Sequence, residues 1–428
     1  MPLKKEFSLL ELTLCGMGII LGAGIYALIG QGAAAAGNAV WLSFAFSALI
    51  AATTGFSYAE LSSMYPEAGA EYDYSRHAFG KKIAFFTGWL VMFASILGAT
   101  TVAIGFGGYF GAFFSVQPIY GAIAIIAAST VILLFGVSMS AKLGAIVTLI
   151  EAGGLLFIIF VGLPHIGSFD IASVPSAQGV LSGAVIVFFA FLGFEEMARF
   201  SEETVDAKKV MPKALMLAIA GSTILYVLVA IAAVSVVGAP ALAQSDSPLA
   251  TVAQAASGPQ AFYLLSVIAL FSTANTVLLV LLAASRFLYG ISKEHALPPA
   301  LHIVSGNGVP WVAVIVTGFL ALAFLAIGKI DFVASAVDLS LFLVFLIINS
   351  ALIKLRFSHP HAERPFKSPF SVFGIPLMAL AGMVFTSILL FSIRDPRIFE
   401  AGLVVAATGI IATFLFVKGH DAPAPQTI

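Results

Sequence analysis

Four glycines lie close together in the first apolar stretch of the sequence, at Gly16, Gly18, Gly22 and Gly24. Glycine costs about 1 kcal/mol relative to alanine inside a helix, so this density favours an interruption. Where no water is available, an interrupted helix exposes main-chain N–H and C=O groups that need new partners. Close packing between helices is the alternative explanation, because small residues let two backbones approach. These glycines alone do not separate the two interpretations.

A second glycine interruption occurs near the middle of the chain, where Gly193 ends an apolar run and Glu195 and Glu196 follow. A charged side chain in hydrocarbon costs at least about 2.5–3.5 kcal/mol, so such acids usually face a cavity or a partner. We consider Glu195 a candidate proton carrier. The alternative is a capping acid at the N-terminal end of a half-helix, where the dipole favours negative charge.

The chemistry available at such interruptions is that of the main chain. The N–H groups at the start of a half-helix near Ala23 suit a carboxylate. The carbonyl groups near Ile20, and those of the second interruption, suit an ammonium group. Adjacent receptors for an anion and a cation match the zwitterion of an α-amino acid. Phe189 and Phe191 either close over the ligand or pack in the interior. The predicted substrate-binding residues are Ile20, Gly22, Ala23, Gly24, Phe189, Ala190, Phe191, Leu192 and Gly193.

The composition places these residues in a membrane protein. Apolar residues make up 60% of the 428 residues and charged residues 10%, against about 25% charged residues in soluble domains. Lipid must therefore be the main solvent. The net charge of −1 gives no reason to expect nucleic acid, and the single cysteine, Cys15, excludes an internal disulfide. No metal or cofactor site is indicated.

A spanning helix needs about 20 apolar residues, and the sequence predicts twelve such stretches. We interpret the first as a retained span rather than a signal peptide, because it is too long and further spans follow. The predicted stretches are 8–36, 41–64, 84–114, 120–137, 143–163, 180–200, 213–237, 262–288, 311–327, 332–355, 374–393 and 399–417.

The positive charges set the orientation. If the N-terminus is cytoplasmic, every lysine and arginine except Lys329, Arg394 and Arg397 falls on the inner side. This predicts a multi-pass protein of the cell membrane with both termini in the cytoplasm. Four loops are long enough for local structure, at 164–178, 239–259, 290–310 and 358–373, and the tail 419–428 is predicted to be disordered.

The two interruptions fall in the first and sixth predicted spans. Five spans is an odd number, so two five-span units, 8–163 and 180–356, would have opposite orientations in the membrane. Interruptions at matching positions of inverted repeats are typical of secondary transporters with a binding site at the midplane. We therefore predict one all-α membrane domain over 1–428, with a 5+5 inverted repeat and two accessory helices within 374–417.

Several motifs resemble the amino acid–polyamine–organocation family of transporters over nearly the whole chain. The resemblance implies the 5+5 fold, alternating access, and amino acids or related amines as substrates. The two interruptions match the substrate-contacting backbone of that family. The motifs are Gly22-Ala23-Gly24-Ile25, Tyr58-Ala59-Glu60-Leu61, the run 65–72, Gly193-Phe194-Glu195, Glu202-Glu203-Thr204, Pro212-Lys213-Ala214, Asn275, Ser285-Arg286, Tyr289-Gly290, Ala296-Leu297-Pro298 and Arg364-Pro365-Phe366-Lys367.

The sequence departs from the family at two positions. Ala23 replaces a frequent serine or threonine, and Glu151 stands where proton-coupled members often have a lysine. We predict that Glu151 is a titrating group beside the first interruption. The alternatives are a glutamate that reaches back to the cytoplasmic surface, and a sodium site formed by Glu151 with Ser272 and Thr273.

The remaining polar residues receive simpler interpretations. Glu60 is predicted to be structural, and Asp338 to line an access path or to reach the surface. Asn275 and Asn349 are expected to form hydrogen bonds between helices. With no charged side chain assigned to the pocket, small neutral L-amino acids are the predicted substrates, taken up with a proton. Sodium coupling and exchange stay open, whereas neither catalytic residues nor repeated filter residues of a channel are found.

Overall fold

The computed structural model describes residues 7–66, 69–136, 141–170, 176–293, 297–306 and 308–417. Within these ranges the chain is helical apart from one short antiparallel hairpin. The predicted disordered tail, 419–428, lies outside the described residues. The elements are α1 (Leu9–Leu21), α2 (Ala23–Ala36), η1 (Gly37–Ala39), α3 (Val40–Met64), α4 (Glu71–Phe79), α5 (Lys81–Phe114), α6 (Pro118–Leu134), α7 (Ala141–Gly162), η2 (Leu163–His165), α8 (Ala177–Phe188), η3 (Phe189–Phe191), η4 (Glu196–Glu203), α9 (Ala207–Ala243), α10 (Pro248–Ser257), α11 (Pro259–Lys293), η5 (Pro299–His302), α12 (Trp311–Phe324), η6 (Leu325–Ile327), α13 (Ile330–Ser358), β1 (Ser371–Val372), β2 (Ile375–Pro376), α14 (Leu377–Ser392) and α15 (Pro396–Phe416).

Most of the helices are suited to a bilayer. The described residues contain 8 helical stretches that are long and apolar enough to cross a membrane, and shorter apolar helices at Leu9–Leu21, Pro118–Leu134, Trp311–Ile327 and Leu377–Ser392. Each predicted apolar stretch coincides with helical structure. Helix α4 was not predicted, because its sequence is polar and short, whereas α10 lies in a loop that was expected to hold local structure.

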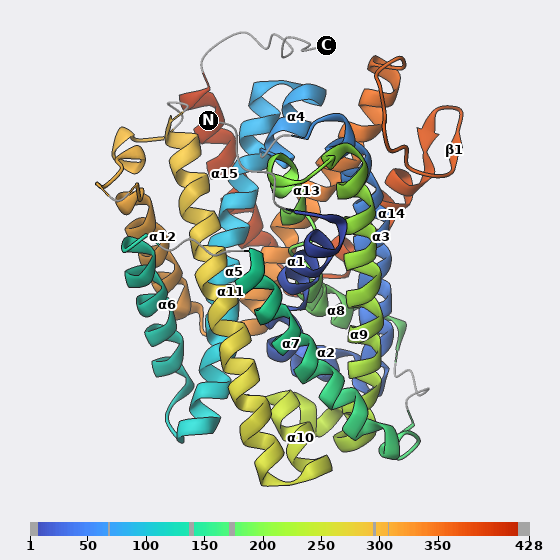
Figure 1. Ribbon diagram of the computed structural model, residues 1–428, viewed down its shortest axis with the longest axis vertical. Coiled ribbons are helices and arrows are strands. Elements are labelled where there is room, and N and C mark those ends of the chain that lie inside the picture. The colour runs from blue at the N-terminus through green and yellow to red at the C-terminus, as the bar shows by residue number, and fades with distance from the viewer. Residues whose placement is uncertain are drawn as a thin grey trace.

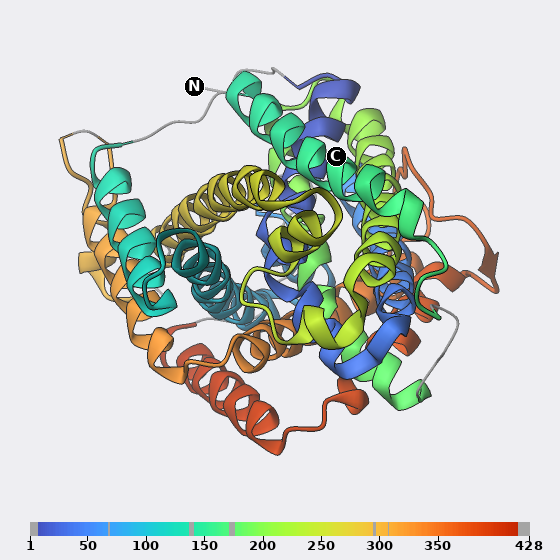
Figure 2. The ribbon, with the colours of Figure 1, turned by 90° about the horizontal axis from the view of Figure 1, so that it is seen from below.

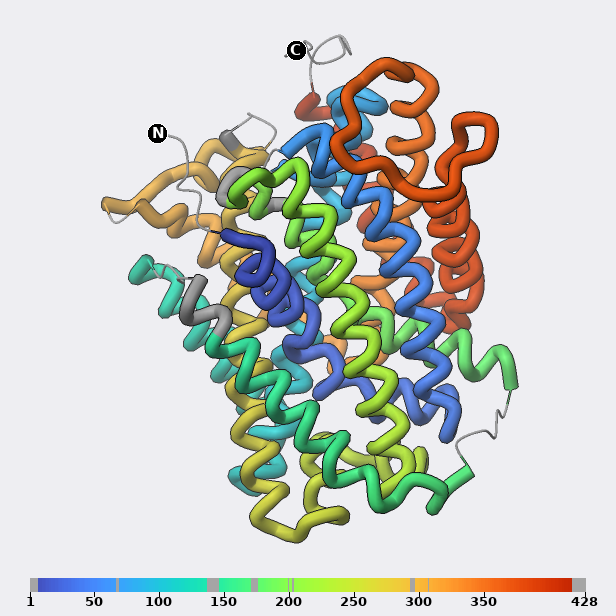
Figure 3. Tube along the Cα trace, turned by 45° about the vertical axis from the view of Figure 1, so that its right-hand side comes forward, coloured from blue at the N-terminus to red at the C-terminus, as the bar shows by residue number. Residues whose placement is uncertain are grey.

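The helices form a bundle whose two ends carry different connections. Helix α4 and the β1–β2 hairpin lie at one end of the molecule and α10 at the other (Figure 1). Viewed from the α10 end, α6, α12 and α15 lie at the periphery (Figure 2). Helix α7 crosses obliquely beside α1 and α9, and the hairpin projects from the body (Figure 3). Helix α4 and the hairpin, which adjoin predicted inner connections, thus lie at the end opposite to α10, which falls in a predicted outer connection.

A polar seam joins α3 to α13 and to the chain that follows α13. Glu60 on α3 is fully buried. Its carboxylate accepts hydrogen bonds from Nε and Nη2 of Arg356 at 2.7 and 2.6 Å, from Nε of Arg364 at 3.1 Å, and from the Ser368 N–H at 2.8 Å. The predicted structural role of Glu60 is confirmed, because this one side chain fixes α13 and the following loop to α3.

The same seam continues one and two turns along α3. Ser57 donates a hydrogen bond to Oδ1 of Asn349 at 2.6 Å, and the amide of Asn349 donates to Thr54 Oγ1 at 3.2 Å. Thr54, Ser57 and Glu60 are spaced by three residues and so lie on one face of the helix. The predicted interhelical role of Asn349 is therefore confirmed.

Candidate functional site

The first interruption lies at Gly22, where α1 ends and α2 begins. Gly22 has φ −42° and ψ −145°, outside the helical region. The N–H of Ala23 donates to Thr276 Oγ1 on α11 at 3.3 Å, and the Thr276 hydroxyl donates to the Ser272 carbonyl at 3.0 Å. A Cβ at Gly22 would lie 2.7 Å from Thr276 Oγ1. The prediction of a broken helix is confirmed, and Thr276 is a partner that the sequence did not reveal.

The second interruption lies between α8 and η4. After η3, Leu192 is extended and Gly193 has φ +111°, a conformation that favours glycine. The N–H of Gly193 donates to Glu195 Oε2 at 3.0 Å, and Glu195 is buried. Glu195 directly precedes η4, but its side chain makes no capping hydrogen bond to that helix and accepts from the Gly193 N–H instead.

The two interruptions lie against each other. A Cβ at Gly24 would lie 2.4 Å from Ala190 Cα, and a Cβ at Gly193 would lie 2.5 Å from Ile19 Cγ2. Each glycine therefore provides room for the main chain of the other segment. The structure brings the predicted binding residues of both segments together, although they are far apart in the sequence.

Tyr226 on α9 connects the two interruptions. Its hydroxyl donates to the carbonyl oxygen of Ile20 and to that of Ala190, the latter at 2.8 Å. The sequence predicted that these carbonyls would be free for an ammonium group. In this structure they are occupied by the Tyr226 hydroxyl, which the sequence did not single out because a tyrosine in a long apolar helix has no distinguishing pattern.

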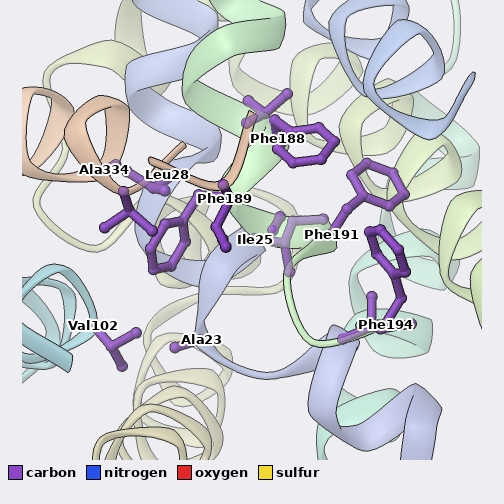
Figure 4. Packing of buried hydrophobic residues seen from close by; sticks show 14 of the residues in the cluster. Ala23, Ile25, Leu28, Val102, Phe188, Phe189, Phe191, Phe194 and Ala334 are labelled. Atoms are coloured by element: carbon purple, nitrogen blue, oxygen red, sulfur yellow. The ribbon is translucent and has the colours of Figure 1, made fainter. Parts of the chain in front are cut away.

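The two phenylalanines of η3 lie on different sides (Figure 4). Phe191 is fully buried beside Phe188 and Phe194, with its ring centroid 5.2 Å from that of Tyr226. Phe189 lies on the other side, beside Leu28 and Ala334, and is 7% exposed. Phe191 therefore packs in the interior in this conformation, and the closure of Phe189 over a ligand stays a prediction.

Glu151 lies beside the first interruption. A Cβ at Gly18 would lie 1.9 Å from Thr148 Oγ1, and one at Gly154 would lie 2.7 Å from the Tyr26 hydroxyl. Thr148, Glu151 and Gly154 share one face of α7, so that face packs on α1 and α2. Glu151 is fully buried. The alternative in which it reaches the cytoplasmic surface is wrong.

The carboxyl group of Glu151 has an unusual environment. The Tyr26 hydroxyl donates to its main-chain carbonyl at 2.9 Å. Among the described residues, neither side-chain oxygen of Glu151 forms a hydrogen bond of good geometry, and the Ser272 hydroxyl, which forms none either, lies close enough to donate a weak one to it. A buried carboxylate without a partner is costly, whereas the protonated acid is much less so.

The two hydroxyl residues that were predicted to bind sodium with Glu151 point at different groups. Ser272 on α11 faces Glu151. The Thr273 hydroxyl donates to the Ala269 and Leu270 carbonyls of its own helix, at 2.7 and 3.3 Å. The hydroxyl of α11 that touches the first interruption is instead that of Thr276.

Asp338 on α13 is fully buried, so it does not reach the surface. It lies next to the main-chain amide of Phe189, where the second interruption begins. Neither of its side-chain oxygens has a hydrogen-bond partner among the described residues. Asp338 thus joins the second interruption, a position that the sequence spacing between α8 and α13 did not indicate.

Comparison with known proteins gives matches over nearly the whole chain. The family model described as "Amino acid permease" matches residues 7–416. The chain is 28% identical to the branched-chain amino acid permease BcaP of Bacillus subtilis, over 98% of this chain and 94% of that protein. It is 28% identical to the methylthioribose transporter of the same organism, over 98% and 95%. It is 28% identical to the vacuolar cationic amino acid transporter 4 of Arabidopsis thaliana, over 84% and 64%.

Proposed function

Since the chain belongs to the amino acid permease family, we propose that it is a secondary active transporter for amino acids that works by alternating access. The observation that carries this proposal is the contact between the two interruptions, Gly24 against Ala190 and Gly193 against Ile19. The N-terminal end of α2 receives the substrate carboxylate. The carbonyls of Ile20 and Ala190 receive the ammonium group when the Tyr226 hydroxyl leaves them.

The proposed architecture is the twelve-span, 5+5 inverted repeat, with accessory helices α14 and α15 and with both termini in the cytoplasm of the cell. The matching interruptions and the distribution of lysine and arginine support it. The relatives named as a branched-chain amino acid permease and a cationic amino acid transporter support an amino acid as the substrate. Small neutral L-amino acids stay the prediction from the sequence.

We further propose that a proton drives uptake and that Glu151 carries it. Its burial without a partner, beside the first interruption, supports this role. Exposure to the outer solution allows proton binding, and exposure to the cytoplasm allows release. Sodium coupling through Glu151 and Ser272, and amino acid exchange without a coupling ion, are the alternatives.

Uptake of labelled amino acids into proteoliposomes, with proton and sodium gradients imposed separately, tests the proposal. We expect an inward proton gradient to accelerate uptake and a sodium gradient to have no effect. Glu151→Gln should abolish the dependence on pH, whereas the exposed control Glu363→Gln should keep it. An unchanged pH profile in Glu151→Gln would refute the proton role, and a strict sodium requirement would establish the sodium alternative.

A further inference from the structure

The β1–β2 hairpin turns at a residue that local backbone conformation disfavours. Val372 pairs with Ile375, so the turn consists of Phe373 and Gly374. Both turn residues have positive φ, +50° and +84°, as a type I′ turn requires. Glycine, asparagine and aspartate usually occupy such positions, because a bulky side chain at positive φ is strained. The turn itself therefore gives no reason for a phenylalanine at this position.

The hairpin also exposes large apolar side chains. Phe373 is 95% exposed and Phe370, which precedes β1, is 70% exposed. Val372 and Phe357, the latter near the end of α13, are exposed as well. A Cβ at Gly374 would lie 3.7 Å from the Phe357 ring, so that ring lies next to the turn. We call Phe357, Phe370, Val372 and Phe373 the apolar tip. Water is a poor solvent for such side chains, and their accumulation on one projection indicates an interaction surface.

The base of the hairpin is fixed to the body of the protein. Nη1 of Arg356 donates a hydrogen bond to the Ser371 hydroxyl at 3.2 Å, and the same arginine pairs with Glu60 in the seam between α3 and α13. The N–H of Leu377, the first residue of α14, donates to the Phe370 carbonyl at 2.8 Å. The apolar tip is therefore held in a defined position relative to α13 and α14.

That position is at the membrane surface. Helix α14 begins directly after β2 and exposes apolar side chains along one face, spaced by three or four residues: Leu380, Val384, Ile388 and Phe391. In the proposed architecture this face contacts lipid. The hairpin projects from the body beside the start of α14 (Figures 1 and 3). The apolar tip thus lies at the depth of the headgroups and continues the lipid-facing surface of α14.

The charges near the hairpin favour an anionic surface. Lys367, just before the hairpin, and Lys354, one turn before Phe357, are both exposed. The sequence contains no aspartate or glutamate from 364 to 393. The cytoplasmic leaflet has a negative surface potential that attracts lysine next to a membrane span. A second copy of this chain on the same surface would bring like charges together, so lipid is the better partner.

We propose that the apolar tip inserts into the headgroup region of the cytoplasmic leaflet, while Lys367 binds the headgroups of anionic lipids. This interaction surface goes beyond the proposed function and does not depend on the transported substrate, although the choice of leaflet follows the proposed orientation. Lipid solvates the ring of Phe373, which accounts for an aromatic residue at a strained and exposed position. Basic residues combined with aromatic and aliphatic ones are typical of segments that lie in the membrane interface.

A fluorescent label on the hairpin tests the proposal. Val372→Cys, in a Cys15→Ser background that leaves no other thiol, is labelled with the environment-sensitive dye NBD. The protein is reconstituted into vesicles of phosphatidylcholine mixed with phosphatidylglycerol. We expect lipids with a nitroxide close to the headgroup to quench the label, and iodide on both sides of the membrane to leave it unquenched. The matched control is Glu363→Cys, an exposed position in the same loop outside the hairpin, where we expect the reverse. A label at 372 that behaves like the label at 363 would refute the insertion.

The variant Phe373→Asn separates insertion from the stability of the turn. Asparagine followed by glycine is a favoured pair for a type I′ turn, so the hairpin should stay folded while its apolar tip is reduced. We expect iodide quenching of the label at 372 to rise to the level found at 363. Thermal unfolding in detergent should show no loss of stability. Unchanged protection from iodide in Phe373→Asn would contradict the proposal.

Two further measurements identify the partner. Lys367→Gln should remove the difference in lipid quenching between these mixed vesicles and vesicles of phosphatidylcholine alone, and a difference that persists would refute the binding of anionic headgroups. If the label at 372 is protected from iodide but not quenched by lipid, and Phe373→Cys forms disulfide-linked dimers, the surface binds a second copy and insertion is refuted. None of these failures affects the proposed transport of amino acids.

Discussion

Two regions of this protein bury carboxyl groups to the same extent but differ in the hydrogen-bond partners that they provide. In the seam between α3 and α13, Glu60 accepts hydrogen bonds from two arginines and a main-chain amide. Around the two interruptions, Glu151 and Asp338 have no hydrogen-bond partner among the described residues. The difference indicates that the seam is complete as it stands, whereas we propose that the interruptions receive partners that arrive and leave.

The largest loss of stability is expected when the hydrogen bonds of the seam between α3 and α13 are removed. Glu60→Gln removes the charge that neutralises Arg356 and Arg364, and both arginine side chains are almost fully buried. Loss of one partner from a buried ion pair destabilises by about 3–5 kcal/mol. Unfolding of the purified protein in detergent measures this, with the exposed Glu400→Gln as the control. A loss as small as that of the control would contradict the structural role of Glu60.

The next largest loss of stability is expected when the contact between the two interruptions is disturbed. Gly24→Ala places a methyl group 2.4 Å from Ala190 Cα, where main-chain atoms must move. Overpacking of this kind costs about 1–3 kcal/mol, and we expect substrate binding to be lost with it. Gly153→Ala on α7 is the matched control, because nothing lies within 4 Å of its added Cβ. Normal transport by Gly24→Ala would show that the interruptions need not touch.

A smaller loss of stability is expected when Tyr226, which connects the two interruptions, is changed. Tyr226→Phe removes the donor shared by the Ile20 and Ala190 carbonyls without changing the packing of the ring. Leaving a buried acceptor unsatisfied costs about 1–3 kcal/mol. Thermal unfolding should show a loss near the lower end of this range, since these carbonyls are also proposed to receive the substrate. Tyr263→Phe, on an exposed tyrosine, should leave stability unchanged.

The smallest effect on stability is expected for Glu151→Gln. Glu151 makes no side-chain hydrogen bond of good geometry, and its weak interaction with the Ser272 hydroxyl can persist in the amide, so we expect a change within about 1 kcal/mol in either direction. The contrast with Glu60→Gln, measured under the same conditions, is the sharpest test of the comparison. A loss equal to that of Glu60→Gln would mean that Glu151 is structural too.

Local patterns in the sequence predicted the elements of the site. The glycines at 22 and 24 and at 193 indicated both interruptions, because glycine weakens a helix wherever the helix lies. Apolar length predicted the helical stretches, because a bilayer requires it. Glu151 could be assigned to the first interruption by resemblance, although not its lack of a partner. The polar and short α4 carries neither signal and was missed.

The partners of the interruptions could not be predicted in this way. Thr276 and Tyr226 lie on α11 and α9, and nothing in their local sequence separates them from other polar residues in apolar helices. Asp338 on α13 was singled out as an acid in an apolar helix, but its place beside Phe189 was not predicted. Helix rotation and crossing determine which of them faces the interruptions. Three hydroxyl residues of α11 show this. Ser272 faces Glu151 and Thr276 contacts Ala23, whereas Thr273, which lies between them in the sequence, donates to its own helix.

The sequence by itself predicted a helical membrane protein with two interrupted helices, and its resemblance to a transporter family placed an acid, Glu151, beside the first interruption. These features depend on residue type and spacing, which act locally. Only the tertiary structure decided that the interruptions touch, that Tyr226 occupies their carbonyls, and that Asp338 lies beside the Phe189 amide. Those facts depend on how separate helices pack, and packing is a property of the whole bundle.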